Sequence, residues 1–257
     1  MDPAVLREDM IDGLEHALDE VSETVVDAMR TVPRHEFVAD RPYDNRDAAH
    51  EGTRVLAPRT VARLCTALDA DPDDEVLVVG AGVGYTAAVL AEVVGPRRVH
   101  AVDIARPLVV EARRNLGETG YGEVLVDRRD GSDGLPAYAP FDRVLVEAAA
   151  VRPPRALLDQ LAPGGRLVMP MGTADQTLVA VERTGDDHDV VAEFGAVAFD
   201  PLLVDGEQAG TTPRNRTARE DREFAQQGYF APAGWEHEWI DWDERLDGGR
   251  GHHSTRR

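Results

Sequence analysis

The chain has 257 residues, 42% of them hydrophobic, which is enough to bury the core of one large α/β domain with additions. Its 48 acidic and 28 basic residues give a formal net charge of -20, which argues against a nucleic-acid partner because phosphate binding needs a basic patch. No apolar run is long enough to span a membrane, and a single cysteine, Cys65, excludes an intrachain disulfide.

The acidic residues are spread along the whole chain, and the basic residues are all arginine. This pattern indicates the surface of a halophilic protein, because molar salt shortens the Debye length to about 3 Å and screens the repulsion between like charges. The N-terminal segment is acidic and lacks the apolar stretch of a signal peptide, so we expect a cytoplasmic protein. For the oligomeric state we expect a monomer or a weak homo-oligomer.

The N-terminal part of the chain carries apolar residues at helical spacing. Over residues 4–31 this spacing predicts two helices, with a break near residues 20–22. Pro33 ends the second helix, and residues 39–56 form a polar loop that is long for a compact domain and therefore a candidate for function. Pro58 then stands where the first turn of the next helix tolerates proline.

A glycine-rich turn follows the most apolar strand of the chain. Residues 76–79 form an unbroken apolar run, as expected of a strand that is buried on both faces. Gly80, Gly82 and Gly84 follow at once, and such glycines let backbone N–H groups approach a ligand. The dinucleotide fingerprint G-x-G-x-x-G needs glycine where Tyr85 stands, so the G-x-G-x-G spacing favours S-adenosylmethionine. The alternative is a strand-to-helix turn that binds no ligand.

Acidic residues lie at the ends of the next two predicted strands. Asp103 ends the strand at residues 98–103, where a carboxylate can accept hydrogen bonds from both ribose hydroxyls of an adenosine. A helix follows, so an N-cap is the alternative role for Asp103. Asp130 and Gly131 follow the third strand, residues 124–126, at the corresponding end.

Strands and helices alternate through the rest of the core, with further strands at residues 141–146 and 167–170. This alternation predicts an α/β fold with a doubly wound, mostly parallel, Rossmann-like sheet. Residues 177–203 are expected to add antiparallel strands at its edge. Ligands of such sheets bind beyond the carboxyl ends of the strands, where the glycine turn, Asp103 and Asp130 all fall.

The C-terminal extension, from about residue 205, begins with a polar segment. Three tryptophans then follow at a spacing that places them on one helix face: Trp235, Trp239 and Trp242. We expect this face to dock onto the body of the protein or onto a dimer partner, with a lid over the substrate cleft as the alternative. The pair His252-His253 is attributed to chance, and no metal site is predicted.

Several stretches resemble the protein-L-isoaspartate O-methyltransferase family, and together they span roughly residues 4–203. The similar stretches are residues 26–38 with their Val-Pro-Arg-x-x-Phe pattern, 80–91, 141–150 and 157–172. The resemblance implies a class I methyltransferase fold that binds S-adenosyl-L-methionine. It implies that the cofactor is held by Gly80, Ala81, Gly82, Gly84, Asp103, Asp130 and Gly131. It also implies repair of isoaspartyl residues in damaged proteins, by methylation of the stray α-carboxylate.

The sequence departs from the family pattern in the loop before Pro58. Where members of the family carry Gly-Gln-Thr-Ile-Ser-x-Pro, residues 52–58 read Gly-Thr-Arg-Val-Leu-Ala-Pro. Leu56 therefore replaces the active-site serine. An acceptor carboxylate with a pKa of about 4 is already a nucleophile at neutral pH, so the loss of this hydroxyl need not abolish transfer. Arg54 either grips a carboxylate bidentately or is a solvent-facing or acid-paired arginine.

The leading interpretation is a carboxyl O-methyltransferase that uses S-adenosylmethionine and acts on isoaspartyl residues of damaged proteins. The alternatives are a methyltransferase with a different acceptor and a non-catalytic S-adenosylmethionine-binding protein, because Leu56 replaces the family serine. We expect three regions: an N-terminal helical cap with the active-site loop at residues 1–58, a cofactor-binding core at 59–204, and a partly disordered C-terminal extension at 205–257.

Overall fold

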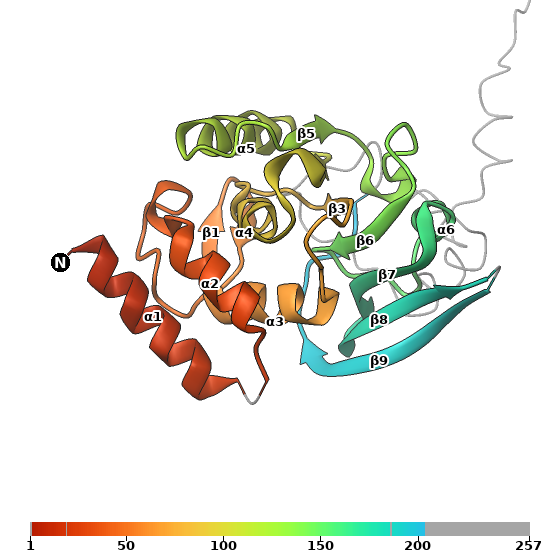
Figure 1. The fold of residues 1–257 in the computed structure, drawn as a ribbon, viewed down its shortest axis with the longest axis horizontal. Helices are drawn as coiled ribbons and strands as arrows, with labels where there is room; N and C mark the ends of the chain where they lie inside the picture. The colour runs from red at the N-terminus through yellow and green to blue at the C-terminus, as the bar shows by residue number, and fades with distance from the viewer. Residues whose placement is uncertain (1, 19, 186, 204–257) are drawn as a thin grey trace, which may run out of the picture.

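The computed structural model describes residues 2–18, 20–185 and 187–203. Within these residues a central sheet has the strand order β5-β4-β3-β6-β7-β8-β9 (Figure 1). Its strands are β3 (Val76–Val79), β4 (Val99–Asp103), β5 (Leu125–Arg128), β6 (Phe141–Val146), β7 (Leu161–Gly172), β8 (Gln176–Thr184) and β9 (Asp187–Val197). The strands from β3 to β7 pair in parallel, whereas β8 and β9 are antiparallel additions, as the sequence predicts.

Helices lie on both faces of this sheet. They are α1 (Pro3–Ala17), α2 (Glu23–Thr31), α3 (Pro58–Leu68), α4 (Tyr85–Val94), α5 (Arg106–Glu118) and α6 (Arg155–Asp159), with 3-10 turns η1 (Arg34–Glu36), η2 (Pro96–Arg98) and η3 (Gly131–Asp133). Side chains of β3 alternate between the faces: Val76 and Val78 join the core under α1 to α5, and Leu77 and Val79 join the core on the α6 side. Strand β3 is therefore buried on both faces, which explains its continuous apolar run.

The strand order reverses between β3 and β6. From β3 the chain moves outward through β4 to β5, and it then returns to the other side of β3 to form β6 and β7. Open α/β sheets bind ligands outside the carboxyl ends of their strands at such a reversal. The glycine turn follows β3, and Glu147 follows β6, so both lie at this position.

The predicted N-terminal elements are largely confirmed, with one correction. Two helices separate near the expected break, and α3 begins at Pro58. The loop predicted over residues 39–56 was wrong in its second half, because β1 (Ala48–His50) and β2 (Thr53–Val55) form an antiparallel hairpin. At its tip Glu51 and Gly52 have φ angles of 45° and 78°, which the tightest hairpin turns require.

One other strand boundary differs from the prediction. Strand β7 begins at Leu161 rather than at residue 167, because the chain is already paired with β6 before a register shift.

None of the described helices is both long and apolar enough to cross a bilayer. The expected C-terminal extension, with its three tryptophans, lies outside the described residues.

Candidate active site

The glycine turn connects β3 to α4 at the point where the strand order reverses. The φ angles are 96° at Gly80, 52° at Gly82 and 92° at Gly84. Residues with a Cβ rarely adopt such positive φ angles. The N–H groups of Gly80 and Ala81 donate hydrogen bonds to the carbonyl of Val102 at 2.9 and 3.0 Å, which fixes the turn to β4. A Cβ added to Gly82 would meet no atom within 4 Å, so this side of the turn is open to a ligand.

Asp103 lies beside the turn, at the end of β4. Its Oδ2 accepts a hydrogen bond from the Gly82 N–H at 3.0 Å, and its Oδ1 accepts one from the Ala105 N–H at 2.9 Å. Burial raises the pKa of the Asp103 carboxyl, and these backbone donors partly oppose the rise. A carboxylate offers about four acceptor positions, so about two remain for the hydroxyls of a ligand. The N-cap of α5 is Ala105, two residues further on.

Asp130 and Gly131 lie on the same edge of the sheet. The Asp130 Oδ1 accepts hydrogen bonds from the N–H and the hydroxyl of Ser132, at 2.9 and 2.7 Å, and so begins η3. Gly131 packs against the end of β3 so closely that an added Cβ would clash with the Val79 side chain. The structure therefore brings Asp130 and Gly131 to the end of the strand from which the glycine turn departs.

A small pocket of about 20 Å³ lies between the glycine turn and the loop before α3. This volume is enough for about one water-sized group, such as one oxygen of a carboxylate. The pocket joins the predicted cofactor positions Ala81 and Gly82 to the predicted acceptor positions Arg54 and Leu56. Its other lining residues are Arg34, Thr53, Val55, Val61, Val83, Tyr85, Thr86 and Glu147.

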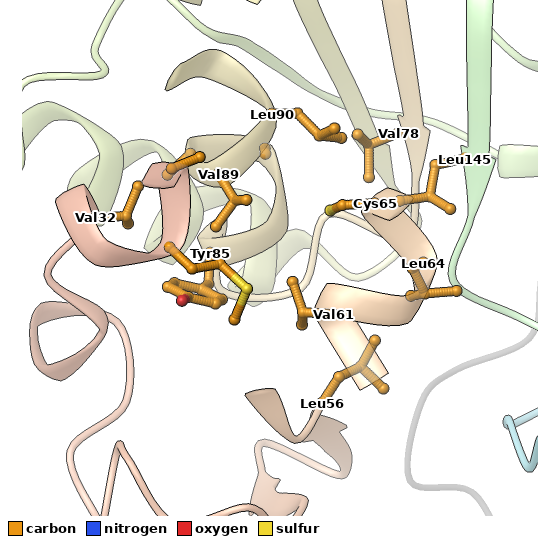
Figure 2. Close-up of a cluster of buried hydrophobic side chains, with 14 of the residues drawn as sticks. Val32, Leu56, Val61, Leu64, Cys65, Val78, Tyr85, Val89, Leu90 and Leu145 are labelled. Carbon is orange, nitrogen blue, oxygen red and sulfur yellow. The ribbon is translucent and has the colours of Figure 1, made fainter. Parts of the chain in front are cut away.

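Leu56 turns its side chain into the core. It is 7% exposed and belongs to the apolar cluster that contains Val61, Cys65 and Tyr85 (Figure 2). Its backbone carbonyl accepts a hydrogen bond from Arg34 Nη2 at 2.5 Å. Leucine fits this position because its neighbours are apolar, and the pocket wall therefore has no hydroxyl at residue 56.

Arg54 reaches the pocket, but its guanidinium is engaged by other groups. Its Nη1 lies 3.0 Å from Asp47 Oδ2 and its Nε lies 3.6 Å from Asp200 Oδ2. It also donates a hydrogen bond to the carbonyl of Ala198. These contacts match the acid-paired alternative for Arg54, and a bidentate grip on a ligand would require them to break.

Arg34 is a second, buried arginine at the pocket. It is 1% exposed, its Nε donates to the Pro42 carbonyl at 2.6 Å, and its guanidinium carbon lies 4.4 Å from the centre of the Tyr85 ring. Burial lowers the pKa of the Arg34 guanidinium, and Tyr85 opposes this. From the sequence, Arg34 stood out only as part of the Val-Pro-Arg-x-x-Phe pattern, which gave no hint that it holds the loop through Pro42 and Leu56.

Glu147 is the site residue that sequence reasoning missed. It follows β6 directly, and a Cβ added to Gly80 would lie 3.3 Å from the Glu147 Cβ. Burial of its carboxyl raises the pKa of Glu147 to about 7, although the side chains of Thr86 and Arg34 lower it. The rule that marked Asp103, an acid at the carboxyl end of a buried strand, would have found Glu147 as well.

The geometry fits a cofactor that carries an adenosine. The glycine turn is open at Gly82, and Asp103 keeps acceptor positions for ribose hydroxyls. Asn115 supports the turn from α5, because its Nδ2 donates to the Val83 carbonyl at 3.0 Å. The turn is thus held from β4 and from α5 in one conformation.

The sequence profile of the family described as Protein-L-isoaspartate(D-aspartate) O-methyltransferase (PCMT) matches residues 6–208. The chain belongs to this family. It is 44% identical over 205 residues to the protein-L-isoaspartate O-methyltransferase of Aeropyrum pernix, a match that covers 76% of this chain and 78% of that protein. With the protein of the same name from Methanopyrus kandleri it shares 42% identity over 222 residues, covering 81% and 95% of the two chains.

Solved structures support the fold of this family member. A protein-L-isoaspartate O-methyltransferase structure superposes with a TM-score of 0.68 at 24% identity, covering 76% of this chain and 65% of that one. A structure from Plasmodium falciparum, described as a protein-L-isoaspartate O-methyltransferase in complex with S-adenosyl-L-homocysteine, gives a TM-score of 0.67 at 20% identity and covers 77% and 98%. The predicted doubly wound α/β class is confirmed.

Proposed function

We propose that this chain is an S-adenosylmethionine-dependent carboxyl O-methyltransferase that methylates the α-carboxylate of isoaspartyl residues in damaged proteins. Its membership of the family supports this activity. The observation that carries the proposal is the pocket that joins Ala81 and Gly82 of the glycine turn to the loop at Leu56. Donor and acceptor can meet only where these two segments adjoin.

On the cofactor side, the open turn and the acids around it form the binding site. The proposed contacts are the backbone of Gly80, Ala81, Gly82 and Gly84, the Asp103 carboxylate, and the segment Asp130-Gly131. When bound, S-adenosylmethionine supplies an activated methyl group. Asp103 orients the adenosine through its remaining acceptor positions, and Gly82 leaves room for the approach.

On the acceptor side, the residues of this chain orient a carboxylate and exclude water. A carboxylate with a pKa of about 4 is ionised at neutral pH, so the reaction needs no base in the protein. The oxygen–carbon bond forms as the carbon–sulfur bond breaks, and no proton moves. Val61, Leu56 and Tyr85 give the pocket an apolar wall, while Arg34 contributes a buried positive charge.

The proposal also covers partners and location. The substrate is a damaged protein or peptide that carries an isoaspartyl residue, with no nucleic acid and no membrane as partner. We also propose that the protein is a monomer or a weak homo-oligomer and that it is located in the cytoplasm. The alternatives are another acceptor or a binding protein without catalysis, and both rest on Leu56 alone. Arg34 and Glu147 still place polar groups at the pocket, which favours an acceptor site there.

Mass spectrometry of a reacted peptide tests this function. An isoaspartyl peptide is incubated with the protein and S-adenosylmethionine in molar KCl, and the product is fragmented to locate the methyl group. The expected product is a methyl ester on the α-carboxylate of the isoaspartyl residue. The same peptide with this carboxylate amidated is the control and should remain unmodified. Methylation of the amidated peptide, or of neither peptide, would contradict the proposal.

A further inference from the structure

Three buried polar atoms line the pocket without a hydrogen-bond partner among the described residues. They are Arg34 Nη1, the Tyr85 hydroxyl oxygen and Glu147 Oε1. A buried polar group that lacks a partner weakens the folded state, and native proteins contain few of them. Three such atoms around one pocket indicate that a polar ligand completes their hydrogen bonding.

Arg34 and Glu147 are the charged members of this set, and they do not touch each other. Among the described residues, no ion pair within 4.0 Å joins Arg34 to Glu147. The positive charge of Arg34 nevertheless lowers the pKa of the Glu147 carboxyl. The Arg34 guanidinium is held elsewhere, because Nε and Nη2 donate to the carbonyls of Pro42 and Leu56. The guanidinium also interacts with the Tyr85 hydroxyl, so Glu147 Oε1, with Arg34 Nη1 beside Tyr85, is the group that a ligand in the pocket would reach.

We propose that Glu147, in its protonated form, donates the hydrogen bond that holds the acceptor carboxylate in the pocket, where the Leu56 side chain has no donor to offer. This inference rests on the proposed function. Arg34 Nη1 adds a charge-assisted donor at the same pocket. The acceptor is thus a carboxylate, since its charge adds to that of Asp47 in balancing the Arg34 guanidinium, which an amide or an ester cannot do.

Protonation of Glu147 follows from its surroundings. Its Oε1 atom is buried although the residue as a whole is half-buried, and the pKa of about 7 places its ionisation near neutral pH. When a second carboxylate arrives beside it, the two negative charges repel, and the pair retains one shared proton. Binding of the acceptor therefore takes up a proton, and departure of the neutral ester allows Glu147 to ionise again.

The titratable and charged groups around Glu147 come from every element that packs against it. They are Arg34 of η1, Arg54 of β2, Cys65 of α3, Tyr85 of α4 and Asp103 of β4. Burial raises the pKa of the Cys65 thiol and raises that of Tyr85 to about 12, so both stay neutral. Asp103 raises the pKa of Glu147, and Arg34 lowers it.

Kinetics as a function of pH test the role of Glu147. The wild type should lose kcat/KM for an isoaspartyl peptide, up to about tenfold per pH unit, above the Glu147 pKa of about 7. Glu147→Gln keeps an N–H donor that cannot ionise, so its kcat/KM should stay flat across this range. Glu147→Ala should raise KM about 10- to 150-fold below pH 7, the equivalent of one hydrogen bond to a charged group, and this difference should shrink at higher pH as Glu147 of the wild type ionises. Glu118→Gln, an exposed change on α5 outside the pocket, is the control and should match the wild type.

Calorimetry supplies a readout that does not depend on turnover. Titration of the isoaspartyl peptide in buffers with different ionisation enthalpies measures the protons taken up on binding. The wild type should take up protons just above pH 7, and Glu147→Gln should take up fewer. Equal uptake by the two proteins would overturn the inference, as would tight peptide binding by folded Glu147→Ala.

A compensating substitution distinguishes a donor from a merely structural residue. Leu56→Ser in the Glu147→Ala background returns a hydroxyl to the pocket wall, and it should recover part of the lost KM. In the wild-type background the same change should have a smaller effect on KM. If the wild type transfers no methyl group to the isoaspartyl peptide at any pH, the proposed function fails; if it does so with a flat pH profile, the inference about Glu147 fails alone.

Discussion

The Gly82 N–H donates a hydrogen bond to the Asp103 carboxylate at 3.0 Å. This bond joins the turn after β3 to the end of β4, two segments that are 21 residues apart in the sequence. The carboxylate therefore holds the turn in its open form before any ligand arrives. Preorganisation of this kind spares the ligand the cost of ordering the loop.

Asp103→Ala should weaken S-adenosylmethionine binding about 10- to 150-fold, because it removes a charged acceptor from both the turn and the ribose. Isothermal titration calorimetry measures the change. Asp127→Ala, on the exposed part of β5, is a matched control and should bind as the wild type does. Unchanged affinity in Asp103→Ala would show that the ribose contact lies elsewhere.

Arg34→Met should destabilise the fold by about 3 kcal/mol or more, since two hydrogen bonds from a charged donor to Pro42 and Leu56 are lost, each worth about 1.5–3 kcal/mol. Urea unfolding measures the free energy. Arg155→Met removes an exposed arginine of α6 and should change stability by at most about 0.5 kcal/mol. Equal effects of the two substitutions would rule out a structural role for the buried guanidinium.

Glu147 should make the free energy of unfolding depend on pH. The native state raises the pKa of this carboxyl from 4.5 to about 7, so the native state binds the proton more tightly than the unfolded state does. The resulting stabilisation is complete below pH 4.5 and is lost as pH rises to about 7, a change of about 3 kcal/mol. Glu147→Gln lacks this dependence, so its stability relative to wild type should rise over the same range. A constant difference between the two proteins would contradict the buried, ionisable carboxyl.

Salt should stabilise the protein strongly. At a net charge of -20, repulsion between surface carboxylates opposes folding in dilute buffer, and molar KCl screens it. Urea unfolding at increasing KCl should give a rising free energy of unfolding, with partial unfolding at the lowest salt. Equal stability in dilute buffer and in molar KCl would remove the interpretation of this surface as halophilic.

Much of the fold could be predicted because short, local sequence patterns determine its strands and turns. The apolar run at Val76–Val79 and the glycines after it mark a buried strand and a turn without reference to the rest of the chain. The acid at Asp103 could be placed beside them because parallel strands bring their carboxyl ends to one edge. The hairpin at residues 48–55 could not be predicted, since each strand has three residues and only one of the six, Val55, is buried.

The acceptor side was harder to predict because its chemistry depends on packing. Sequence placed Arg54 and Leu56 at the loop but could not show that Asp47 and Asp200 neutralise Arg54. It also could not show that Arg34 and Glu147, more than 100 positions apart, leave unpaired atoms around one pocket. Such groups are defined by neighbours that different elements supply, and no single segment carries that information.

The central claim is that this chain methylates isoaspartyl carboxylates although Leu56 replaces the family serine. The most direct test compares kcat/KM for an isoaspartyl peptide and for the matching aspartyl peptide, with labelled S-adenosylmethionine in molar KCl. The account predicts transfer to the isoaspartyl peptide and none above background to the aspartyl peptide. Cofactor binding without transfer to either peptide, or equal transfer to both, would contradict it.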